Sequence, residues 1–219
     1  MKKFLICGLV LLSIFIIYLA NMDKKVYYLA LGDSSDYLDG VKGYSFYVKN
    51  YLSEKGVLEK YVYEYSNHND RITDIIRKIN DNSRVKDYTL KNSLVKADLV
   101  TITINIDDIF DRINDDSVLY SEVYDYIDDL TLDLEKLFKL MREYCKEDII
   151  FIGYYNSYSG EVQDVINYLN KRYREICLDY DIKFVDISKI DINGNLKNEY
   201  YKKIGDKVND VVNKSLFKG

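Results

Sequence analysis

The sequence predicts a three-layer α/β/α sandwich, in which helices cover both faces of a five-stranded parallel sheet of flavodoxin-like strand order. Two observations support this fold class. Short apolar runs alternate along the chain with segments whose apolar residues recur at helical spacing, and the connections between them are short. The run LVTITI at 99–104 is also apolar enough to be buried on both sides, as strands of a parallel sheet are.

Five apolar runs are expected to be strands. The first, VYYLAL, leads directly into the polar sequence Gly32-Asp33-Ser34-Ser35. The second is the aromatic run YVYEY, and the later ones include IIFIG and IKFVDI. Their expected ranges are 26–31, 61–65, 99–104, 149–153 and 182–187.

Six segments between and after these strands are expected to be amphipathic helices. Their apolar residues recur every three or four positions, as in the isoleucines of 71–79, and Gly56 marks the end of the first helix. The expected ranges are 44–55, 71–79, 89–96, 117–146, 162–178 and 200–216. Because no linker or repeat interrupts them, residues 26–219 are predicted to form one domain.

Composition excludes some function classes before any motif is considered. Apolar residues make up 47% of the 219 residues, enough for a real core. The net charge is −5, with 36 acidic against 31 basic residues, whereas a nucleic-acid binder normally has a basic surplus. We therefore expect no nucleic-acid partner.

The N-terminal segment 1–25 is expected to be a membrane anchor. Seventeen uncharged residues, 4–20, follow Lys2 and Lys3, and their helical length of about 25 Å approaches that of a membrane span if residues 21 and 22 are included. A removed signal segment remains the alternative, although Tyr18 at the −3 position disfavours cleavage after Ala20. The short lysine tail favours an extracytoplasmic domain on a single-pass anchor through residues 4–22.

Three cysteines carry little functional information. Cys7 lies in the anchor, and Cys145 and Cys177 lie in the body without a CxxC pattern or a nearby histidine. Two buried thiols are the favoured interpretation, and a Cys145–Cys177 disulfide is the alternative that export would permit.

Four of the expected strands are followed at once by small or polar residues. These sequences are 32–35 (GDSS), 66–71 (SNHNDR), 105–108 (NIDD) and 154–157 (YYNS). In open α/β sheets the functional residues gather beyond the carboxyl ends of the strands. The four sequences are therefore predicted to meet at one edge of the sheet.

Taken together, these segments resemble the GDSL, or SGNH, hydrolases, including a bacterial membrane-anchored subgroup of lipase-like members. ALGDSS resembles the family's first block, EYSNHNDRITDIIRKI its second, LVTITINIDDIF its third, and NEYYKKIGDKVNDVV the helix after its last. The similarity spans residues 26–216. It implies a serine ester hydrolase with Ser34 as nucleophile, no metal or other cofactor, and lipids, acyl esters or acetylated glycans as ligands.

The sequence departs from the family pattern at the other catalytic positions. Asn69 stands where the family has the glycine of its oxyanion hole, and Asp107 where it has the oxyanion-hole asparagine. Asn195 takes the place of the catalytic histidine, and Asp191, the candidate triad acid, precedes it by four residues instead of three. The chain has one histidine, His68, in the second block.

These departures predict weak or lost hydrolysis. A serine hydroxyl needs a neighbouring base to take its proton, and an asparagine cannot act as that base. A carboxylate at Asp107 would also repel the charge that develops on the oxyanion.

Two further hypotheses stay open. His68 could serve as a relocated base for Ser34, oriented by Asp107 or Asp33, in an active esterase. The domain could instead be a non-catalytic scaffold or ligand-binding protein in envelope or spore assembly.

Three remaining patterns are given structural interpretations. The acidic residues are expected to form a solvated loop and not a calcium site, and 191–194 (DING) a turn. Some tyrosines, such as Tyr154, Tyr155 and Tyr158, could line a carbohydrate or acyl pocket. The acidic cluster comprises Asp107, Asp108, Asp111, Asp115 and Asp116.

Overall fold

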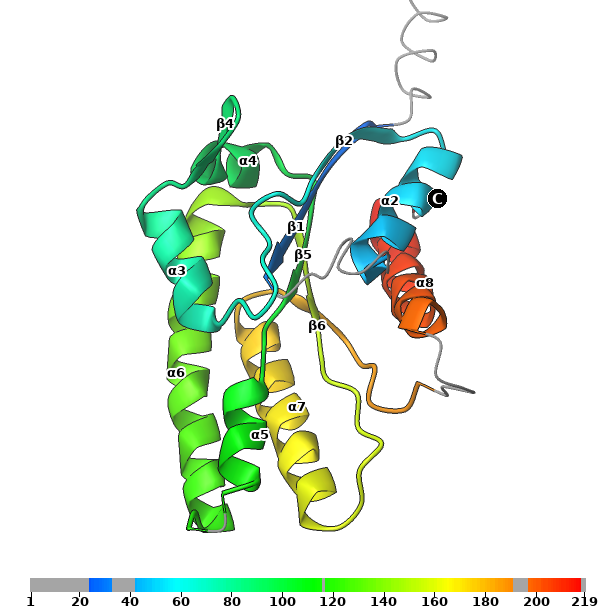
Figure 1. Ribbon diagram of the computed structural model, residues 1–219. Coiled ribbons are helices and arrows are strands. Elements are labelled where there is room, and N and C mark those ends of the chain that lie inside the picture. The colour runs from blue at the N-terminus through cyan, green and yellow to red at the C-terminus, as the bar shows by residue number, and fades with distance from the viewer. Residues whose placement is uncertain (1–23, 33–41, 116, 191–196, 218–219) are drawn as a thin grey trace, which may run out of the picture.

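A five-stranded parallel sheet forms the centre of the computed structural model, which describes residues 24–32, 42–115, 117–190 and 197–217 (Figure 1). The strand order is β2-β1-β5-β6-β7, and each neighbouring pair is parallel. This is the flavodoxin-like order that the sequence predicts. The strands are β1 (Val26–Gly32), β2 (Leu58–Val62), β5 (Leu99–Thr103), β6 (Asp148–Ile152) and β7 (Lys183–Val185).

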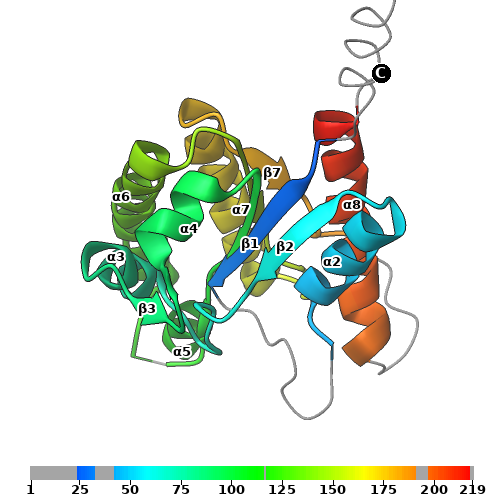
Figure 2. The ribbon, with the colours of Figure 1, turned by 90° about the horizontal axis from the view of Figure 1, so that it is seen from above.

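Helices cover both faces of the sheet, which confirms the three-layer arrangement. One face carries α2 (Tyr44–Glu54) and α8 (Lys197–Leu216), which pack on each other (Figure 2). The opposite face carries α3 (Ile72–Asn80), α4 (Leu90–Lys96), α6 (Tyr120–Tyr144) and α7 (Glu161–Asp179). Strand β1 is buried on both sides: Leu29 and Leu31 face the four-helix layer, while Tyr28 and Ala30 face α2 and α8.

Strand β2 begins and ends three residues earlier than the sequence predicts. The turn after α2 returns the chain at once, since the Val57 amide donates to the Leu52 carbonyl at 3.1 Å and Val26 donates to the Val57 carbonyl at 2.8 Å. Pairing with β1 therefore starts at Leu58. Tyr65, which the aromatic pattern assigns to the strand, lies in the following turn, where its hydroxyl donates to the Tyr88 carbonyl at 2.8 Å.

Two small elements are absent from the sequence prediction. A hairpin of β3 (Arg84–Val85) and β4 (Tyr88–Thr89) precedes α4, and helix α5 (Asp107–Ile113) follows β5. The expectation of a solvated acidic loop is thus wrong for Asp107, Asp108 and Asp111, which lie in α5. Carboxylates in a first helical turn interact favourably with the helix dipole, so this acidic sequence supports a helix start.

The other elements lie where they are predicted, with ends that differ by at most three residues. Cys145 and Cys177 are buried free thiols, as favoured, and burial raises the pKa of both. Of the helices within the described ranges, none has the length and apolar character needed to cross a membrane. The run 4–22 and the expected turn at 191–194 lie outside those ranges.

Candidate functional site

The carboxyl ends of β1 and β5 come unusually close at Gly32. This glycine has φ +89° and pairs with Thr103, and a Cβ built on it would lie 1.7 Å from the Thr103 carbonyl oxygen. Only a residue without a side chain fits there. Gly32 therefore allows the end of β1 to lie directly against the end of β5. This is the carboxyl edge of the sheet, where the polar sequences follow the strands.

The loop after β2 is fixed to this edge by buried polar contacts. The Ser66 hydroxyl donates to the Ala30 carbonyl at 2.9 Å, and the Asn67 amide donates to Asp70 Oδ2 at 3.0 Å. Asp70 also forms an ion pair with Lys78, which donates to the Tyr65 carbonyl as well. Burial raises the pKa of Asp70, and the hydrogen bond from Lys78 opposes that shift.

Asn69, Asn105 and Asp107, which we call the amide cluster, meet across two loops. The side-chain amide nitrogen of Asn105 donates to Asn69 Oδ1 at 3.3 Å and to Asp107 Oδ2 at 3.0 Å. Asn105 Oδ1 accepts the Asp107 backbone N–H at 2.9 Å, an Asx turn that takes up the first N–H of α5, whose N-cap residue is Ile106. The structure thus brings together the two residues expected at the oxyanion-hole positions, through a third that links them.

Asn69 adopts a backbone conformation that suits its place in the family pattern. Its φ is +68°, in the left-handed region where glycine is most at ease and asparagine is the best tolerated alternative. The glycine-to-asparagine change therefore keeps the turn. It leaves a backbone N–H at the position where the resemblance expects a donor.

The other predicted catalytic residues are placed less fully. His68 lies in the exposed turn immediately before Asn69. Ser34 and Asp191 lie outside the described ranges, as do Asp33 and Asn195. Asp107 is exposed at the start of α5.

A cavity of about 150 Å³, which we call the tyrosine cavity, opens beside Thr103 between the ends of β5 and β6 and the first turns of α2 and α8. Tyr154 and Tyr155 line it, whereas Tyr158 instead packs against Phe110, with ring centroids 5.4 Å apart. Burial raises the pKa of Tyr200, whose ring lies 5.8 Å from that of Tyr155.

Sequence reasoning missed three tyrosines of this cavity, Tyr44, Tyr200 and Tyr201. Each lies in the first turn or second turn of a helix that follows a strand. In this topology such turns face the carboxyl edge, so position at a helix start was the available signal.

The acidic cluster does not gather into a cation site in the described part of the chain. Asp108 forms an ion pair with Arg71 at 2.6 Å, and Asp115 accepts from the Ser117 hydroxyl. No three histidine, cysteine or acidic side chains among the described residues are placed to hold one metal ion. Asp116 lies outside those residues.

Several solved structures share this fold at low sequence identity. A phospholipase A1 from Streptomyces albidoflavus NA297 is 13% identical, with a TM-score of 0.54 over 86% of this chain and 98% of its own. An acetyl xylan esterase is 14% identical, with a TM-score of 0.60 over 84% and 98%. An extracellular lipase from Streptomyces rimosus is also 14% identical, with a TM-score of 0.57 over 86% and 98%.

No curated protein matches the sequence. The sequence model of the GDSL-like Lipase/Acylhydrolase family, in contrast, matches residues 28–212, which include most of β1 and the other four strands of the sheet. The match carries the first-strand motif, the second and third loops and most of the terminal helix in one alignment. The chain therefore belongs to the GDSL-like lipase/acylhydrolase family.

Proposed function

We propose that this protein is a membrane-tethered member of the family that binds a small acyl ester or acetylated glycan at the carboxyl edge and hydrolyses it weakly or not at all. The observation that carries the proposal is that the whole sequence has one histidine, His68. It lies in the second loop, not in the segment before α8, where the family places its base. Without a base, the hydroxyl of Ser34 is a poor nucleophile at neutral pH.

The amide cluster supports weak hydrolysis independently. Asn105 is the side-chain amide nearest in sequence to the third-block position, and both of its acceptors are side-chain oxygens, on Asn69 and Asp107. Those two hydrogen bonds occupy both N–H donors of the Asn105 side chain. The Asp107 carboxylate adds negative charge where a hydrolase needs donors.

The ligand class follows from the tyrosine cavity. Its volume of about 150 Å³ is well below the roughly 300–1,000 Å³ of sites for drug-sized ligands, so a short acyl group suits it better than a fatty acid. Ser34 follows Gly32 by two residues, which span at most about 7 Å, so its hydroxyl can meet a ligand at this edge. Acetyl xylan esterase among the similar structures is consistent with acetyl groups.

The test is restoration of the missing base. In the full chain, held in detergent, Asn195→His combined with Asp107→Asn is expected to raise p-nitrophenyl acetate hydrolysis at least tenfold over the parent. Adding Ser34→Ala should abolish that gain. A parent that already turns over at ordinary enzyme rates of about 1–10³ s⁻¹, and loses them in Ser34→Ala, would contradict the proposal.

The active-esterase alternative is tested by His68→Gln. One feature favours this alternative: His68 directly precedes Asn69, so a histidine lies in the loop at the carboxyl edge of the sheet. If His68 takes the serine proton, the parent's hydrolysis should disappear in His68→Gln and in Ser34→Ala alike. If His68 has no catalytic part, His68→Gln should match the parent.

The tether and its orientation are part of the proposal. The uncharged run 4–20 supports a single-pass anchor, and the shortness of the tail before it, with Lys2 and Lys3, favours a domain outside the membrane. Alkaline carbonate washing of membranes, followed by protease treatment of intact cells, tests both points. A protein released by carbonate, or protected from protease, would contradict them.

A further inference from the structure

The loop after β6 forms one wall of the tyrosine cavity and runs beyond the end of its strand. Gly153, Tyr154 and Tyr155 all line the cavity, whereas β6 ends at Ile152. The Gly153 amide still donates to the Val185 carbonyl of β7 at 3.0 Å. Tyr154, the next residue, is buried, so its backbone N–H and C=O need partners within the protein.

Asn170 of α7 supplies both of those partners. Its side chain is 6% exposed, its Oδ1 accepts the Tyr154 N–H at 2.8 Å, and its Nδ2 donates to the Tyr154 carbonyl at 2.8 Å. A side-chain amide offers an acceptor and a donor together, as the backbone of a neighbouring strand does. A helix on the four-helix side therefore holds this residue of the loop as a further strand would.

Gly153 shows how closely the amide fits against the loop. A Cβ built on Gly153 would lie 2.7 Å from Asn170 Oδ1 and 2.5 Å from Cζ of Phe184. The Phe184 ring stacks on Phe151 with centroids 6.0 Å apart, and Phe151 in turn contacts the Tyr154 ring edge to face at 6.4 Å. The glycine, the amide and the rings thus pack as one unit behind the cavity wall.

Holding Tyr154 in place also determines where Tyr155 lies. The Tyr154 ring packs on the four-helix side, 6.0 Å from the ring of Tyr173. The Tyr155 ring packs on the opposite side, 5.8 Å from the ring of Tyr200 at the start of α8. Successive side chains of an extended chain point to opposite faces, so a fixed backbone at Tyr154 directs Tyr155 toward Tyr200 across the cavity.

We propose that Asn170 is a positioning residue that restricts the tyrosine cavity to a short acyl group. It acts through the loop, because it lies behind the lining residues and is not one of them. Without its two hydrogen bonds, a buried N–H and a buried C=O would lose their partners, and the loop would open to give them water. An open wall admits longer acyl groups. The inference rests on the proposed function for its ligand but does not require hydrolysis.

Two amide-linked probes measure acyl length without an ester. N-acetylglucosamine and N-butanoylglucosamine, which differ by two methylene groups, are titrated against the full chain in detergent by ligand-observed NMR. The parent is expected to bind the acetyl probe about tenfold more tightly, the lower end of the discrimination that one methylene group gives in a closed pocket. Asn170→Leu keeps a similar volume without hydrogen bonds and should reduce this preference to about twofold or less, through tighter binding of the butanoyl probe.

The matched control is Thr131→Val, which also removes a buried polar group. Thr131 is 2% exposed on α6 and donates its hydroxyl to the Asp128 carbonyl, away from the cavity wall. This variant should lose stability and keep the parent's preference for the acetyl probe. Asn170→Ala, which cannot overfill the site, repeats the test if Asn170→Leu does not fold.

Hydrogen exchange measures the loop without any ligand. Backbone amides of residues 153–158, followed by mass spectrometry, should exchange faster in both Asn170 variants than in the parent, and at the parent's rate in Thr131→Val. This measurement separates the position of the wall from the identity of the ligand.

Faster exchange together with a reduced acetyl preference, in the Asn170 variants alone, supports the proposal. Unchanged exchange in residues 153–158, an unchanged preference in the Asn170 variants, or an equal loss of preference in Thr131→Val overturns it. If neither probe binds the parent, the ligand class of the proposed function is contradicted, and hydrogen exchange alone decides whether Asn170 holds the wall.

Discussion

At the scale of single residues, Gly32 determines whether the edge that carries the functional loops can form. Its positive φ alone would favour glycine, but the closer constraint is the Thr103 carbonyl, which already occupies the space of a Cβ. Gly56 also has a positive φ, of +71°, yet nothing lies within 4 Å of its would-be Cβ. A side chain at position 56 would therefore cost only backbone strain, whereas a side chain at position 32 would also collide with the Thr103 carbonyl.

Gly32→Ala is expected to destabilise the protein by about 3 kcal/mol or more, since backbone must move to admit the methyl group. Gly56→Ala should cost only about 1 kcal/mol, from the left-handed conformation alone. For a domain of this size these values correspond to melting temperatures lower by about 9 °C and 3 °C. Thermal unfolding followed by circular dichroism measures both. Equal decreases in melting temperature for the two variants would contradict the expected collision between the methyl group added at position 32 and the Thr103 carbonyl.

At the scale of elements, helix α5 depends on Asn105 for its start. The Asn105 side chain accepts the first free N–H of the helix and at the same time holds Asn69 of the neighbouring loop. A helix of seven residues gains little from its own propagation, so this contact matters more than a comparable one in α6.

Asn105→Ala should lower stability by about 1 kcal/mol, the usual net contribution of one intramolecular hydrogen bond. Asn105→Ser keeps a short oxygen acceptor and should recover most of that loss. Asn114→Ala, at the exposed opposite end of α5, is the control and should stay within about 0.5 kcal/mol of the parent. Urea unfolding of the three variants decides. A loss in Asn114→Ala equal to that in Asn105→Ala would contradict this role of Asn105.

At the scale of the whole molecule, parallel strands give the domain two different ends. Lys24 forms an ion pair with Asp98 at 2.7 Å at the amino edge, where the chain enters β1 (Figure 1). The amide cluster and the tyrosine cavity lie at the opposite edge. The seven residues of β1 separate the two edges by about 20 Å. A tether in residues 4–22 would therefore hold the amino edge near the membrane and direct the site away from it.

This orientation can be measured with one exposed cysteine at a time in a Cys7→Ser background, in which the remaining thiols, Cys145 and Cys177, are buried. Val95→Cys is at an exposed position in the last turn of α4, near the amino edge, and Tyr158→Cys is exposed beyond β6 at the carboxyl edge. In vesicles, a fluorophore at 95 should be quenched by nitroxide headgroup lipids much more than one at 158. Equal quenching, or the reverse order, would contradict the orientation and with it the short tether.

The sheet could be predicted from the sequence because β1 and β5 are continuous apolar runs. Such a run indicates a buried strand without knowledge of its contacts with distant residues. The sequence prediction placed β2 three residues late, since tyrosines 63 and 65 have strand-like composition but are used in a turn set by the contacts of Val57. Helix α5 was missed because its acidic sequence is compatible with a loop until the Asn105 contact is seen.

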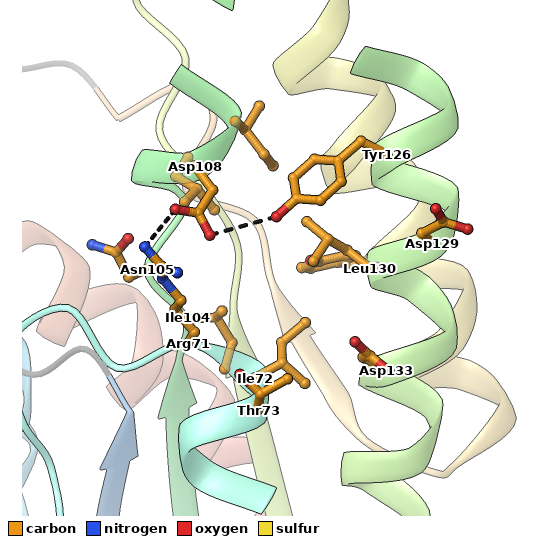
Figure 3. A pocket seen from close by; sticks show the side chains of 13 residues that line it. Arg71, Ile72, Thr73, Ile104, Asn105, Asp108, Tyr126, Asp129, Leu130 and Asp133 are labelled. Carbon is orange, nitrogen blue, oxygen red and sulfur yellow. Dashed lines mark hydrogen bonds and ion pairs between the residues drawn. The ribbon is translucent and has the colours of Figure 1, made fainter. Parts of the chain in front are cut away.

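The candidate site could be predicted only for residues that directly follow a strand, because the order of the strands already brings them to the carboxyl edge. Asn69 and Asp107 follow β2 and β5, the two strands that flank β1, so their presence at one edge of the sheet could be inferred, whereas their link through Asn105 required coordinates. The same holds for a cavity of about 220 Å³ on the four-helix side of the sheet (Figure 3), which is lined by Arg71, Tyr126 and Tyr173 from segments far apart in the chain. Tertiary packing creates such sites, and no local pattern marks them.

The collision at position 32 changes what the Gly-Asp-Ser sequence can tell an observer. A descendant of an esterase that had abandoned catalysis would still retain that glycine, because its architecture fails without it. The glycine of the Gly-Asp-Ser sequence is thus required for packing, whether or not the protein hydrolyses esters. Surveys that seek inactive members of such lineages should weigh positions 107 and 195 above the opening triplet.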